Sequence, residues 1–351
     1  MNWRLHLKAE PIDWLLEPKN PSIRYFTLRD ILECPENNPE LITAKQSIVK
    51  SKVVQRILAK QNPNGYWGTS IQPYHPKYKS SYWQIMLLGQ LGMDKSDERI
   101  QKACEHIFRF QLGEGGFSSY SKKETSIEYH RLNMKALAKG KSLPERKAWM
   151  QSFITEHEYS CLTGNMVAAL LRLGFRDDPR VKKALDWLVS IQNEDGGWLC
   201  PYWQAHIKDT HSCFYGTICP LEAFSEIPEA ERSNEIKRAI EKGAEFLLMH
   251  RLFKADHHNF QIIKPQWLRL GFPWFYGYDI LRGLVVLTKL GYTKDERLTD
   301  AIEILLEKQQ PDGKWILEST PAGRMWINIE AKGQPSKWIT LNALRVLKNI
   351  G

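Results

Sequence analysis

One seven-residue phrase occurs four times in the chain and constrains its fold more than any other feature. The copies read QNPNGYW at 61–67, QLGEGGF at 111–117, QNEDGGW at 192–198 and QQPDGKW at 309–315, with the shared form Q-x3-G-x-(W/F). Recurrence in fixed form is typical of an architecture built from one supersecondary unit. The chain is therefore expected to be a repeat protein.

Each copy of the phrase ends a segment with helical periodicity. In 51–60, 99–110, 180–191 and 297–308, apolar residues recur every three or four positions, as in a helix with one buried face. The glycine four positions after the glutamine supplies the backbone freedom that ends a helix, and the aromatic residue after it can fold back over the helix end. A fifth helix of this kind is expected over 234–249, where the terminating phrase is degenerate.

A second, more apolar series of helices alternates with the first. Its members are expected at about 23–32, 81–91, 160–173, 212–224, 275–290 and 337–350. Helices that are apolar all round lie inside, and one-faced helices wrap around them. The pattern predicts an all-α protein, an α/α toroid with about six inner and five to six outer helices, formed by a single domain over 1–351. An open solenoid of helical hairpins is the alternative.

Three long connections, at 68–79, 118–159 and 199–210, are expected as loops at one end of this ring. Each of them leads from an outer helix to the next inner helix. Functional residues concentrate in loops held by a rigid scaffold, and helix N-termini favour anions. A binding site is therefore expected at this mouth.

Charge and composition narrow the kinds of partner. The 351 residues carry a net charge of +9, spread along the chain, which favours an anionic partner such as a diphosphate or an acidic membrane surface. No nucleic-acid-binding motif is present, so nucleic acid is not an expected partner. No apolar run reaches the length of a membrane span, and the N-terminus lacks the features of a signal peptide. A cytoplasmic protein with reduced or metal-bound cysteines is expected.

The recurring phrase on alternating helices resembles the QW-like repeat of the squalene cyclase and protein prenyltransferase β-subunit superfamily, from Gln61 onward. The resemblance implies a toroid that handles an isoprenoid. Triterpene cyclases of this superfamily start by protonation from an Asp-x-Asp-Asp motif, which is absent here, so a protonation-type cyclase is not expected. The adjacent Asp177 and Asp178 are better explained as a helix cap. Asp279, in WFYGYDILR, stays as a lone candidate catalytic acid on an inner helix.

The prenyltransferase branch of the superfamily implies a zinc site. Its members hold zinc with an Asp-x-Cys element on one inner helix and a histidine on the next. Here Cys161 in EYSCLTG and His211 in DTHSCF match the cysteine and the histidine, but Tyr159 stands where the family has aspartate. Zinc takes three or four N, S or O ligands in tetrahedral geometry. The candidate set is Cys161, Cys200, His211 and Cys213, with Asp209 as an alternative ligand. Ordinary buried thiols are the competing interpretation, and a magnesium site made only of protein ligands is not expected.

Candidate substrate-binding residues lie on or near the inner helices. Aromatic faces pack an isoprenoid chain and stabilise an allylic cation, whereas Arg and Lys bind diphosphate. The family's own diphosphate-binding run before the Asp-x-Cys element has no counterpart here. The aromatic candidates are Tyr82, Trp83, Phe214, Tyr215, Trp274, Phe275, Tyr276, Tyr278 and Trp338, and the cationic ones are Arg269, Arg282, Arg324 and Lys337.

The leading functional hypothesis is a prenyltransferase-like enzyme that handles an isoprenoid diphosphate in the ring, with zinc at its mouth. The alternative is a non-catalytic toroid that binds a lipid or a protein and has structural cysteines. A carbohydrate-active ring would need paired carboxylates at the mouth, for which Glu158, Asp209 and Asp279 are the only candidates. A helical partner subunit, and a peripheral membrane contact through the GFPWFYGY segment, are further hypotheses.

Overall fold

The computed structural model describes residues 3–199 and 211–351 of the chain. Over these residues the regular structure is helical, and β pairing is limited to isolated bridges. No helix among them is long and apolar enough to cross a membrane. The helices are η1 (Trp3–His6), α1 (Ile12–Leu15), α2 (Pro21–Phe26), η2 (Thr27–Ile31), α3 (Pro39–Ile48), α4 (Lys52–Leu58), α5 (Ser81–Gln90), α6 (Glu98–Phe108), α7 (Lys122–Leu137), α8 (Arg146–Glu156), α9 (Ser160–Arg172), α10 (Pro179–Ser190), α11 (Phe214–Ser225), η4 (Glu229–Glu231), α12 (Asn234–Met249), η5 (Pro265–Leu268), α13 (Ile280–Lys289), η6 (Glu296–Leu298), α14 (Thr299–Glu307) and α15 (Lys337–Ile350).

Two concentric sets of helices form the body of the protein. The inner set is α2 with η2, α5, α9, α11, α13 and α15, and its side chains are buried almost throughout; in α9, every residue from Ser160 to Leu171 is buried. The outer set, which includes α4, α6, α10, α12 and α14, buries one face only, as α10 shows. Helices with one apolar stripe cover helices that are buried all round, as the sequence pattern predicts.

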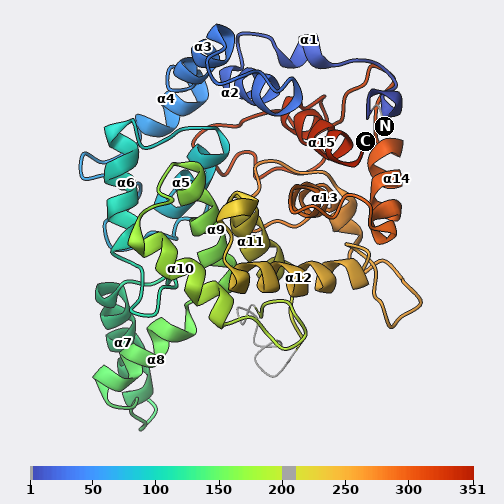
Figure 1. The fold of residues 1–351 in the computed structure, drawn as a ribbon. Helices are drawn as coiled ribbons and strands as arrows, with labels where there is room; N and C mark the ends of the chain where they lie inside the picture. The colour runs from blue at the N-terminus through green and yellow to red at the C-terminus, as the bar shows by residue number, and fades with distance from the viewer. Residues whose placement is uncertain (1–2, 200–210) are drawn as a thin grey trace.

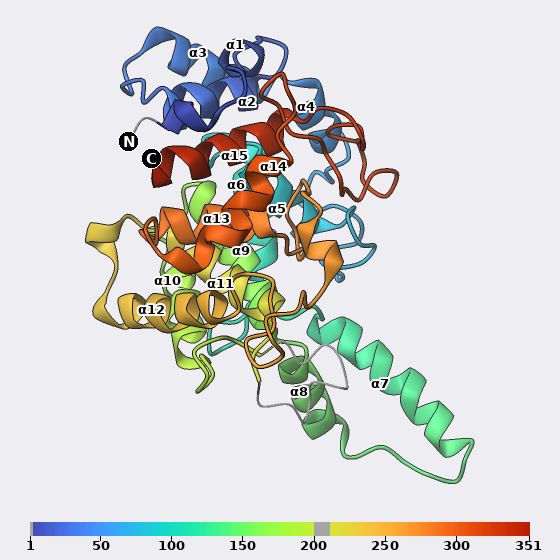
Figure 2. The ribbon, with the colours of Figure 1, turned by 90° about the vertical axis from the view of Figure 1, so that its right-hand side faces the viewer.

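The inner helices follow one another around a ring. In the described part of the chain, α5, α9, α11, α13 and α15 are successive neighbours, and α15 also contacts α2 and η2. Phe26 of α2 lies against Gly92, just after α5, and this contact completes the circuit. Figure 1 shows the ring with α13 seen end-on, and Figure 2 shows it from the side. The α/α toroid is therefore confirmed.

The repeated phrase joins each outer helix to the next unit through contacts that we call the latch. The amide of Gln192 donates to the carbonyl of Gly196 over 2.6 Å and to that of Ala239, in the next outer helix, over 2.8 Å. Trp198 donates its ring N–H back to Leu188 over 2.7 Å and its backbone N–H to a threonine hydroxyl on α11 over 3.1 Å. Gln61 and Gln111 make the corresponding two bonds, so the latches fix the stacking of successive units.

Glycine is required in the latch for two reasons. Gly196 has φ +90°, a conformation that other residues adopt at a cost. A Cβ at this position would also lie 2.5 Å from the carbonyl oxygen of Lys242, in the next outer helix. The glycine therefore both turns the chain and lets the next helix approach.

The last latch closes on the N-terminal segment instead of on another outer helix. The backbone N–H of Lys8 donates to the side-chain oxygen of Gln309 over 2.9 Å, and its ammonium donates to the Gln309 carbonyl over 2.6 Å. A Cβ on Gly313 would lie 2.0 Å from the carbonyl oxygen of Ala9, where the earlier glycines face an outer helix. The first residues of the chain thus occupy the position of a following unit.

The segment 270–279 crosses the interior of the ring, and the helix predicted from 275 begins only at Ile280. The carboxylate of Asp279 accepts the backbone N–H of Arg282 over 2.8 Å and so caps α13 at this point. Before the cap, the backbone of Trp274 exchanges two hydrogen bonds with the side chain of Gln90, at 3.0 and 2.5 Å. The ring of Phe272 stacks on Trp338, with centroids 4.3 Å apart.

The loop predicted over 118–159 is wrong, because this region contains α7 and α8. These two helices form a hairpin, here called the arm, that extends away from the ring (Figure 2). Ser121 caps α7 by accepting the N–H of Glu124 over 3.1 Å. Within α8, Trp149 stacks on Phe153 with centroids 4.7 Å apart, and Trp149 also contacts Tyr129 of α7 at 5.3 Å. The sequence pattern did not indicate these helices because α7 and α8 are mainly polar, and their few apolar residues form no broad stripe.

Candidate functional site

Two cavities occupy the interior of the ring, one at each end. The large cavity, of about 1370 Å³, lies at the end where the inner helices begin. The small cavity, of about 540 Å³, lies at the end where they finish. Phe272 and Trp274 of the crossing segment line both cavities and stand between them. The large cavity therefore lies at the mouth predicted from the loops, and its volume exceeds that of ordinary small-molecule sites.

One wall of the large cavity is a cluster of aromatic rings around Trp83, in the first turn of α5. The Trp83 ring lies 5.3 Å from Tyr74, 4.7 Å from Tyr78, 5.1 Å from Phe275 and 5.3 Å from Tyr276, measured between centroids. Tyr74 and Tyr78 come from the loop before α5, whereas Phe275 and Tyr276 come from the crossing segment. Edge-to-face packing of this kind gives a rigid apolar surface with π faces available to a ligand.

A second aromatic group continues the wall on the far side. Phe214, the first residue of α11, lies 4.4 Å from Trp267 and 5.2 Å from Tyr278. The Trp267 N–H donates to the hydroxyl of Tyr215 over 3.2 Å, and the Tyr278 hydroxyl donates to a backbone carbonyl over 2.7 Å. With their polar atoms satisfied in this way, these rings present mainly carbon to the cavity.

Asp279 is a buried acid in the wall of the large cavity. Its carboxylate accepts two backbone N–H groups, from Arg282 at 2.8 Å and from Gly271 at 3.0 Å. Burial disfavours the ionised form more than these bonds favour it, and the pKa of Asp279 is raised to about 6. Asp279 is therefore protonated in part of the molecules near neutral pH, as a proton donor requires.

Tyr276 places a second protic group in the same cavity. Among the described residues its hydroxyl is buried without a hydrogen-bond partner, and burial raises its pKa well above the ordinary value. A buried hydroxyl without a partner is costly. It is therefore a candidate donor to a polar atom of a ligand.

Cations surround the opening of the large cavity. Lys77, Lys264, Arg269 and Arg324 line it and are exposed. The ammonium of Lys264 also lies 5.5 Å from the centroid of the Trp267 ring. Four positive groups around an aromatic interior form an amphiphilic site, with a cationic rim and an apolar interior.

The same opening carries histidines around Asp256. The ring of His211 lies 5.7 Å from His250 and 6.4 Å from His257. Asp256 lies 3.5 Å from the Nε2 of His250 and also contacts His257. Burial lowers the pKa of His250, which favours its neutral form near pH 7.

The predicted zinc ligands are only partly brought together. Cys161, His211 and Cys213 all line the large cavity, while Cys200 and the alternative ligand Asp209 lie outside the described residues. The Cys213 sulfur accepts the N–H of Gly216 over 3.1 Å, as a cap of α11. Within 3–199 and 211–351, no three His, Cys, Asp or Glu side chains are grouped so as to hold a metal ion. The zinc site therefore stays a prediction, because two of its five candidate ligands lie outside the described residues.

Most of the predicted substrate-binding residues line the large cavity: Trp83, Phe214, Tyr215, Arg269, Trp274, Phe275, Tyr276, Tyr278 and Arg324. Tyr82 lies in the core instead, where its hydroxyl donates to the carbonyl of Ser118 over 2.8 Å. Trp338 lines the small cavity. The ammonium of Lys337 lies 2.9 Å from Glu17 and donates to the Trp14 carbonyl, so it is not in the predicted diphosphate site.

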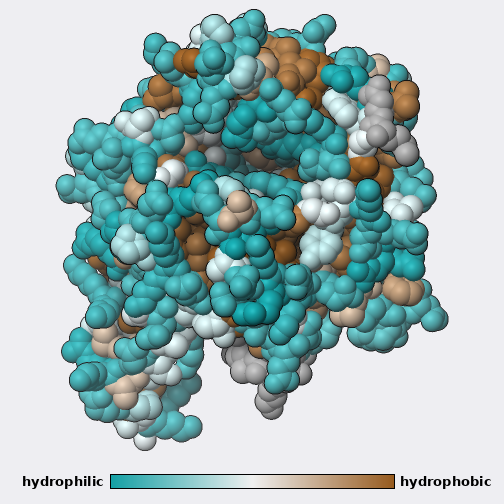
Figure 3. Space-filling view, in the orientation of Figure 1, coloured by the Kyte–Doolittle hydropathy of each residue, from teal (hydrophilic) through white to brown (hydrophobic). Residues whose placement is uncertain are grey.

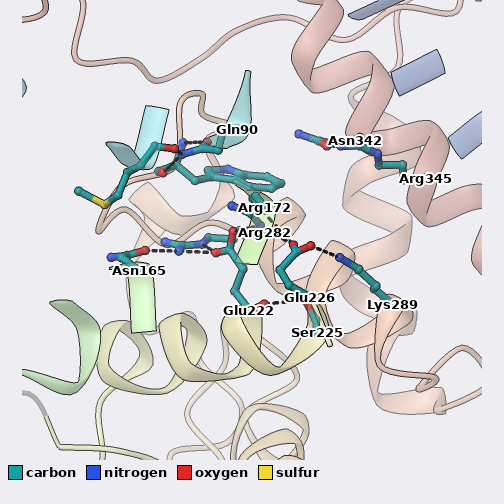
Figure 4. A network of polar contacts seen from close by, with 12 residues as sticks. Gln90, Asn165, Arg172, Glu222, Ser225, Glu226, Arg282, Lys289, Asn342 and Arg345 are labelled. Carbon is teal, nitrogen blue, oxygen red and sulfur yellow. Dashed lines mark hydrogen bonds and ion pairs between the residues drawn. The ribbon is translucent and has the colours of Figure 1, made fainter. Parts of the chain in front are cut away.

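Arg282 is also not a free diphosphate ligand, because it is buried among protein partners. Its guanidinium contacts Glu222 and donates to Asn165 over 3.0 Å (Figure 4). It also donates to the Phe275 carbonyl over 3.0 Å. These bonds hold the crossing segment against α9 and α11. The predicted diphosphate role of Arg282 is therefore replaced by a structural one.

Sequence reasoning missed several residues of the large cavity. Tyr74, Lys77 and Tyr78 lie in the loop 68–79, which the repeat pattern predicts at the mouth without indicating individual residues. Lys264 and Trp267 lie between α12 and α13, in a region that no repeat covers. Aromatic and basic residues concentrated in a mouth loop were the signal that could have identified the first three.

The chain is similar in sequence to sterol and hopene cyclases. It is 23% identical over 248 residues to a lanosterol synthase of Aspergillus fumigatus, covering 64% of this chain and 28% of that protein. It is 23% identical over 294 residues to a lanosterol synthase of Gibberella zeae, covering 78% of this chain and 35% of that protein. A stretch of 37 residues is 57% identical to a squalene–hopene cyclase of Bradyrhizobium diazoefficiens, covering 10% of this chain and 6% of that protein. The chain spans about a third of the length of the two synthases.

Among solved structures, a protein from Actinoplanes aligns with 14% identity and a TM-score of 0.45, over 96% of this chain and 89% of that one. The type II terpene cyclase MstE from Scytonema, without ligand, aligns with 14% identity and a TM-score of 0.45, over 95% of this chain and 98% of that one. The same enzyme has been solved with geranylgeranyl dihydroxybenzoate as its substrate. No protein-family model matches the chain.

Proposed function

We propose, for a chain that has the squalene/terpenoid cyclase superfamily fold, that the large cavity binds an isoprenoid lipid. The aromatic wall takes the hydrocarbon chain, and the cations at the rim take an anionic head group. The observation that carries this proposal is one cavity of about 1370 Å³ that joins two aromatic clusters to four exposed cations. Similarity to proteins named lanosterol synthase and squalene–hopene cyclase supports the same class of ligand.

Binding of two matched probes tests the proposal. Geranylgeranyl diphosphate and geranylgeraniol share a chain and differ in the head group, so calorimetric titration with each separates the two halves of the site. Trp83→Ala should weaken both probes by about tenfold or more, because it removes the centre of an aromatic cluster. Arg269→Gln with Arg324→Gln should weaken only the diphosphate.

The control for the charge change is Arg297→Gln, whose side chain pairs with Glu245 on the outer surface over 2.7 Å. It should leave both probes unaffected. Failure of the wild-type protein to bind either probe would refute the proposal. If Trp83→Ala leaves the affinity for both probes unchanged, the ligand binds somewhere other than the large cavity.

Proton transfer from Asp279 is a second candidate function, favoured by its position and its raised pKa. The step delivers the carboxyl proton to one carbon of an isoprenoid double bond and leaves a carbocation on the other. Aromatic faces stabilise the cation, and the N–H groups of Gly271 and Arg282 hold the carboxylate that remains. A second double bond of the chain then attacks this carbocation, which closes a ring and moves the positive charge to another carbon. Loss of a proton from a carbon next to that new cation forms a double bond.

A product assay separates catalysis from simple binding. Incubation with geranylgeranyl diphosphate, followed by mass spectrometry and chromatography, detects an isomer with a ring. Asp279→Asn should abolish the product and keep binding within a few-fold. Binding without product in the wild type would favour the non-catalytic alternative, a toroid that binds lipid.

Zinc-dependent prenyl transfer, with or without a helical partner subunit, stays a proposal that rests on Cys161 and His211. A zinc ion there would supply Lewis acidity or a bound thiolate, but it takes no step in the chemistry above. Elemental analysis of the untagged wild type, Cys161→Ala and His211→Ala tests it. Near-stoichiometric zinc that falls in both variants supports the site, and wild-type protein without zinc after zinc supplementation contradicts it.

A further inference from the structure

The small cavity lies among charged residues at the end of the ring opposite the mouth: Glu222 is buried, whereas Arg29 and Lys289 are exposed. Figure 3 shows this face, where hydrophilic residues surround a hollow near the centre. The cavity receives residues from all six inner helical segments, from Arg29 in η2 to Arg345 in α15. It is separated from the large cavity by Phe272 and Trp274, so its occupant is independent of the isoprenoid site.

One part of this charged network is centred on two glutamates of α11. Glu222 contacts Arg282 and lies 2.5 Å from Arg172. Glu226 lies 2.8 Å from Arg172 and 2.8 Å from Lys289 (Figure 4). Neighbouring cations lower the pKa of both glutamates, so both are ionised at neutral pH.

The other part is centred on Asp30, in η2. Arg345 and Arg29 each lie 2.5 Å from its carboxylate. Arg345 also donates to the buried Asn342 over 2.7 Å. These two cations lower the pKa of Asp30 despite its burial.

The two parts together hold five cations against three carboxylates. The remaining charges on the cavity wall are paired separately: Lys45 with Asp94 over 2.7 Å, Arg176 with Glu231 over 2.9 Å, and Glu33 with Lys348 over 2.8 Å. The five are Arg29, Arg172, Arg282, Lys289 and Arg345. Four of them line the cavity, whereas Arg282 contacts Glu222 without lining it. The network as a whole has a surplus of two positive charges, which an anion or water in the cavity compensates.

Several donors in the network remain available for a ligand. Arg172 uses Nε and Nη2 for its glutamates, and Arg29 uses Nε and Nη2 for Asp30. Each therefore has Nη1 for another acceptor, because guanidinium carries five N–H donors. The ammonium of Lys289 has three N–H donors and pairs with one carboxylate of the described residues, that of Glu226. Forked donors of this kind match oxyanions.

We propose that the small cavity binds a small doubly charged oxyanion of the phosphate class between Arg172, Lys289 and Arg345. Such a dianion offsets the surplus charge, and its oxygens accept the N–H donors that the carboxylates leave free. The same chemistry is available in free phosphate and in the head group of a phosphorylated lipid.

Thermal unfolding and calorimetric titration with inorganic phosphate test the site. Phosphate should raise the Tm of the wild type with concentration, and more than chloride at equal ionic strength. Lys289→Gln and Arg345→Gln, alone and together, should weaken phosphate by about tenfold or more. At low salt the double variant should keep the wild-type secondary structure, because it removes both surplus charges.

The control Arg297→Gln should respond to phosphate like the wild type. A variant response equal to the wild-type response, or a wild-type effect no larger than that of chloride, would overturn the proposal. Geranyl diphosphate identifies the source of the oxyanion: if it binds, if Lys289→Gln abolishes that binding and if inorganic phosphate does not bind, free phosphate is overturned as the ligand in favour of a lipid head group.

A second, independent observation concerns the arm. Residues 122–147 contain eight Lys and Arg residues and three Glu, a net +5 out of the +9 of the whole chain. On α7, Ile127, Met134 and Leu137 are 55%, 66% and 53% exposed. Their spacing of seven and three residues places them on one face of the helix.

We propose that this face of α7 docks on an anionic lipid membrane. Large apolar side chains flanked by lysines are the composition of helices that lie in a membrane interface. In Figure 2 the arm extends on the side where α15 begins, away from its C-terminal end. The base of the arm also reaches the large cavity, because Glu124 accepts a hydrogen bond from Gln72, which in turn holds the N–H of Tyr74 at 3.0 Å.

Co-sedimentation with phosphatidylcholine vesicles, with and without phosphatidylglycerol, tests this docking. The wild type should bind only the anionic vesicles, and high salt should release it. Met134→Ser with Leu137→Ser, and separately Lys135→Glu with Lys139→Glu, should each abolish binding.

The charge-matched control is the double variant Lys102→Glu with Lys237→Glu, on the outer helices α6 and α12. This variant should bind anionic vesicles as the wild-type protein does. If this control loses vesicle binding as much as the arm charge variant does, the loss is caused by the net charge of the protein and not by the arm. That result would overturn the proposal. Vesicle binding by the arm variants equal to that of the wild type would also overturn the proposal. So would arm variants that differ from the wild type in oligomeric state and not in vesicle binding.

Discussion

Replacing Asp279 with asparagine should change how the stability of the protein depends on pH. The pKa of Asp279 is raised from 3.8 to about 6 by burial. A raised pKa means that the folded state favours the protonated acid. The stabilising effect is therefore fully present below about pH 4 and is lost as the pH rises through about 6.

The magnitude follows from the shift. About two pKa units at ~1.36 kcal/mol each give ~3 kcal/mol of free energy of unfolding between pH 4 and pH 8. The asparagine variant cannot titrate, but its amide cannot accept both N–H groups that Asp279 accepts, which costs ~1–3 kcal/mol at every pH. The variant should therefore be less stable than the wild type at low pH. Between pH 4 and pH 8 its free energy of unfolding should rise by ~3 kcal/mol relative to that of the wild type.

Urea denaturation of both proteins at several pH values measures this difference. Burial also raises the pKa of Glu124 and of Glu158 to about 7. Both glutamates titrate in the same way in the wild type and in the variant. Their contributions therefore cancel in the difference between the two free energies of unfolding. A difference in unfolding free energy that stays constant within ~0.5 kcal/mol from pH 4 to pH 8 would refute the assignment of a buried, partly protonated acid.

Two further substitutions test the construction of the ring. Gly196→Ala should destabilise the protein by ~1–3 kcal/mol, because it forces φ +90° on alanine and brings a Cβ to 2.5 Å from the Lys242 carbonyl; an unchanged midpoint of chemical denaturation would contradict this. Arg282→Met should cost ~3–5 kcal/mol, because it removes one buried partner of Glu222, whereas Arg297→Met on the outer surface should cost ~0.5 kcal/mol or less. Equal effects of the two arginine changes, measured by thermal unfolding, would show that the buried pair has no special weight.

Much of the ring could be predicted from the sequence because the information is local. The latch residues lie within seven positions of one another, and the type of each residue determines its role. Gln192 donates hydrogen bonds, Gly196 allows the chain to turn, and Trp198 covers the end of the helix. The inner helices are identified by apolar composition alone. Their order around the ring follows from the chain order, since successive units are neighbours.

The predictions failed where the deciding contact is distant in sequence. Arg282 and Glu222 are 60 residues apart, and nothing near Arg282 shows that its partner is a carboxylate rather than a diphosphate. The start of α13 was placed too early because the aromatic residues before Asp279 are as apolar as a buried helix. Their real partners, Gln90 and Trp338, come from other helices across the ring.

The closing of the last latch on the N-terminal segment has a consequence for the order of folding. The latches of Gln61, Gln111 and Gln192 join residues 38, 69 and 47 positions apart, so each can form once the next outer helix has been synthesised. The contact between Lys8 and Gln309 spans 301 positions. Lys8 is therefore synthesised long before its partner, and the inner helices stay an open arc until the repeat that contains Gln309 is complete. Closure of so long a loop is entropically costly, which makes it the step expected to limit the rate of folding.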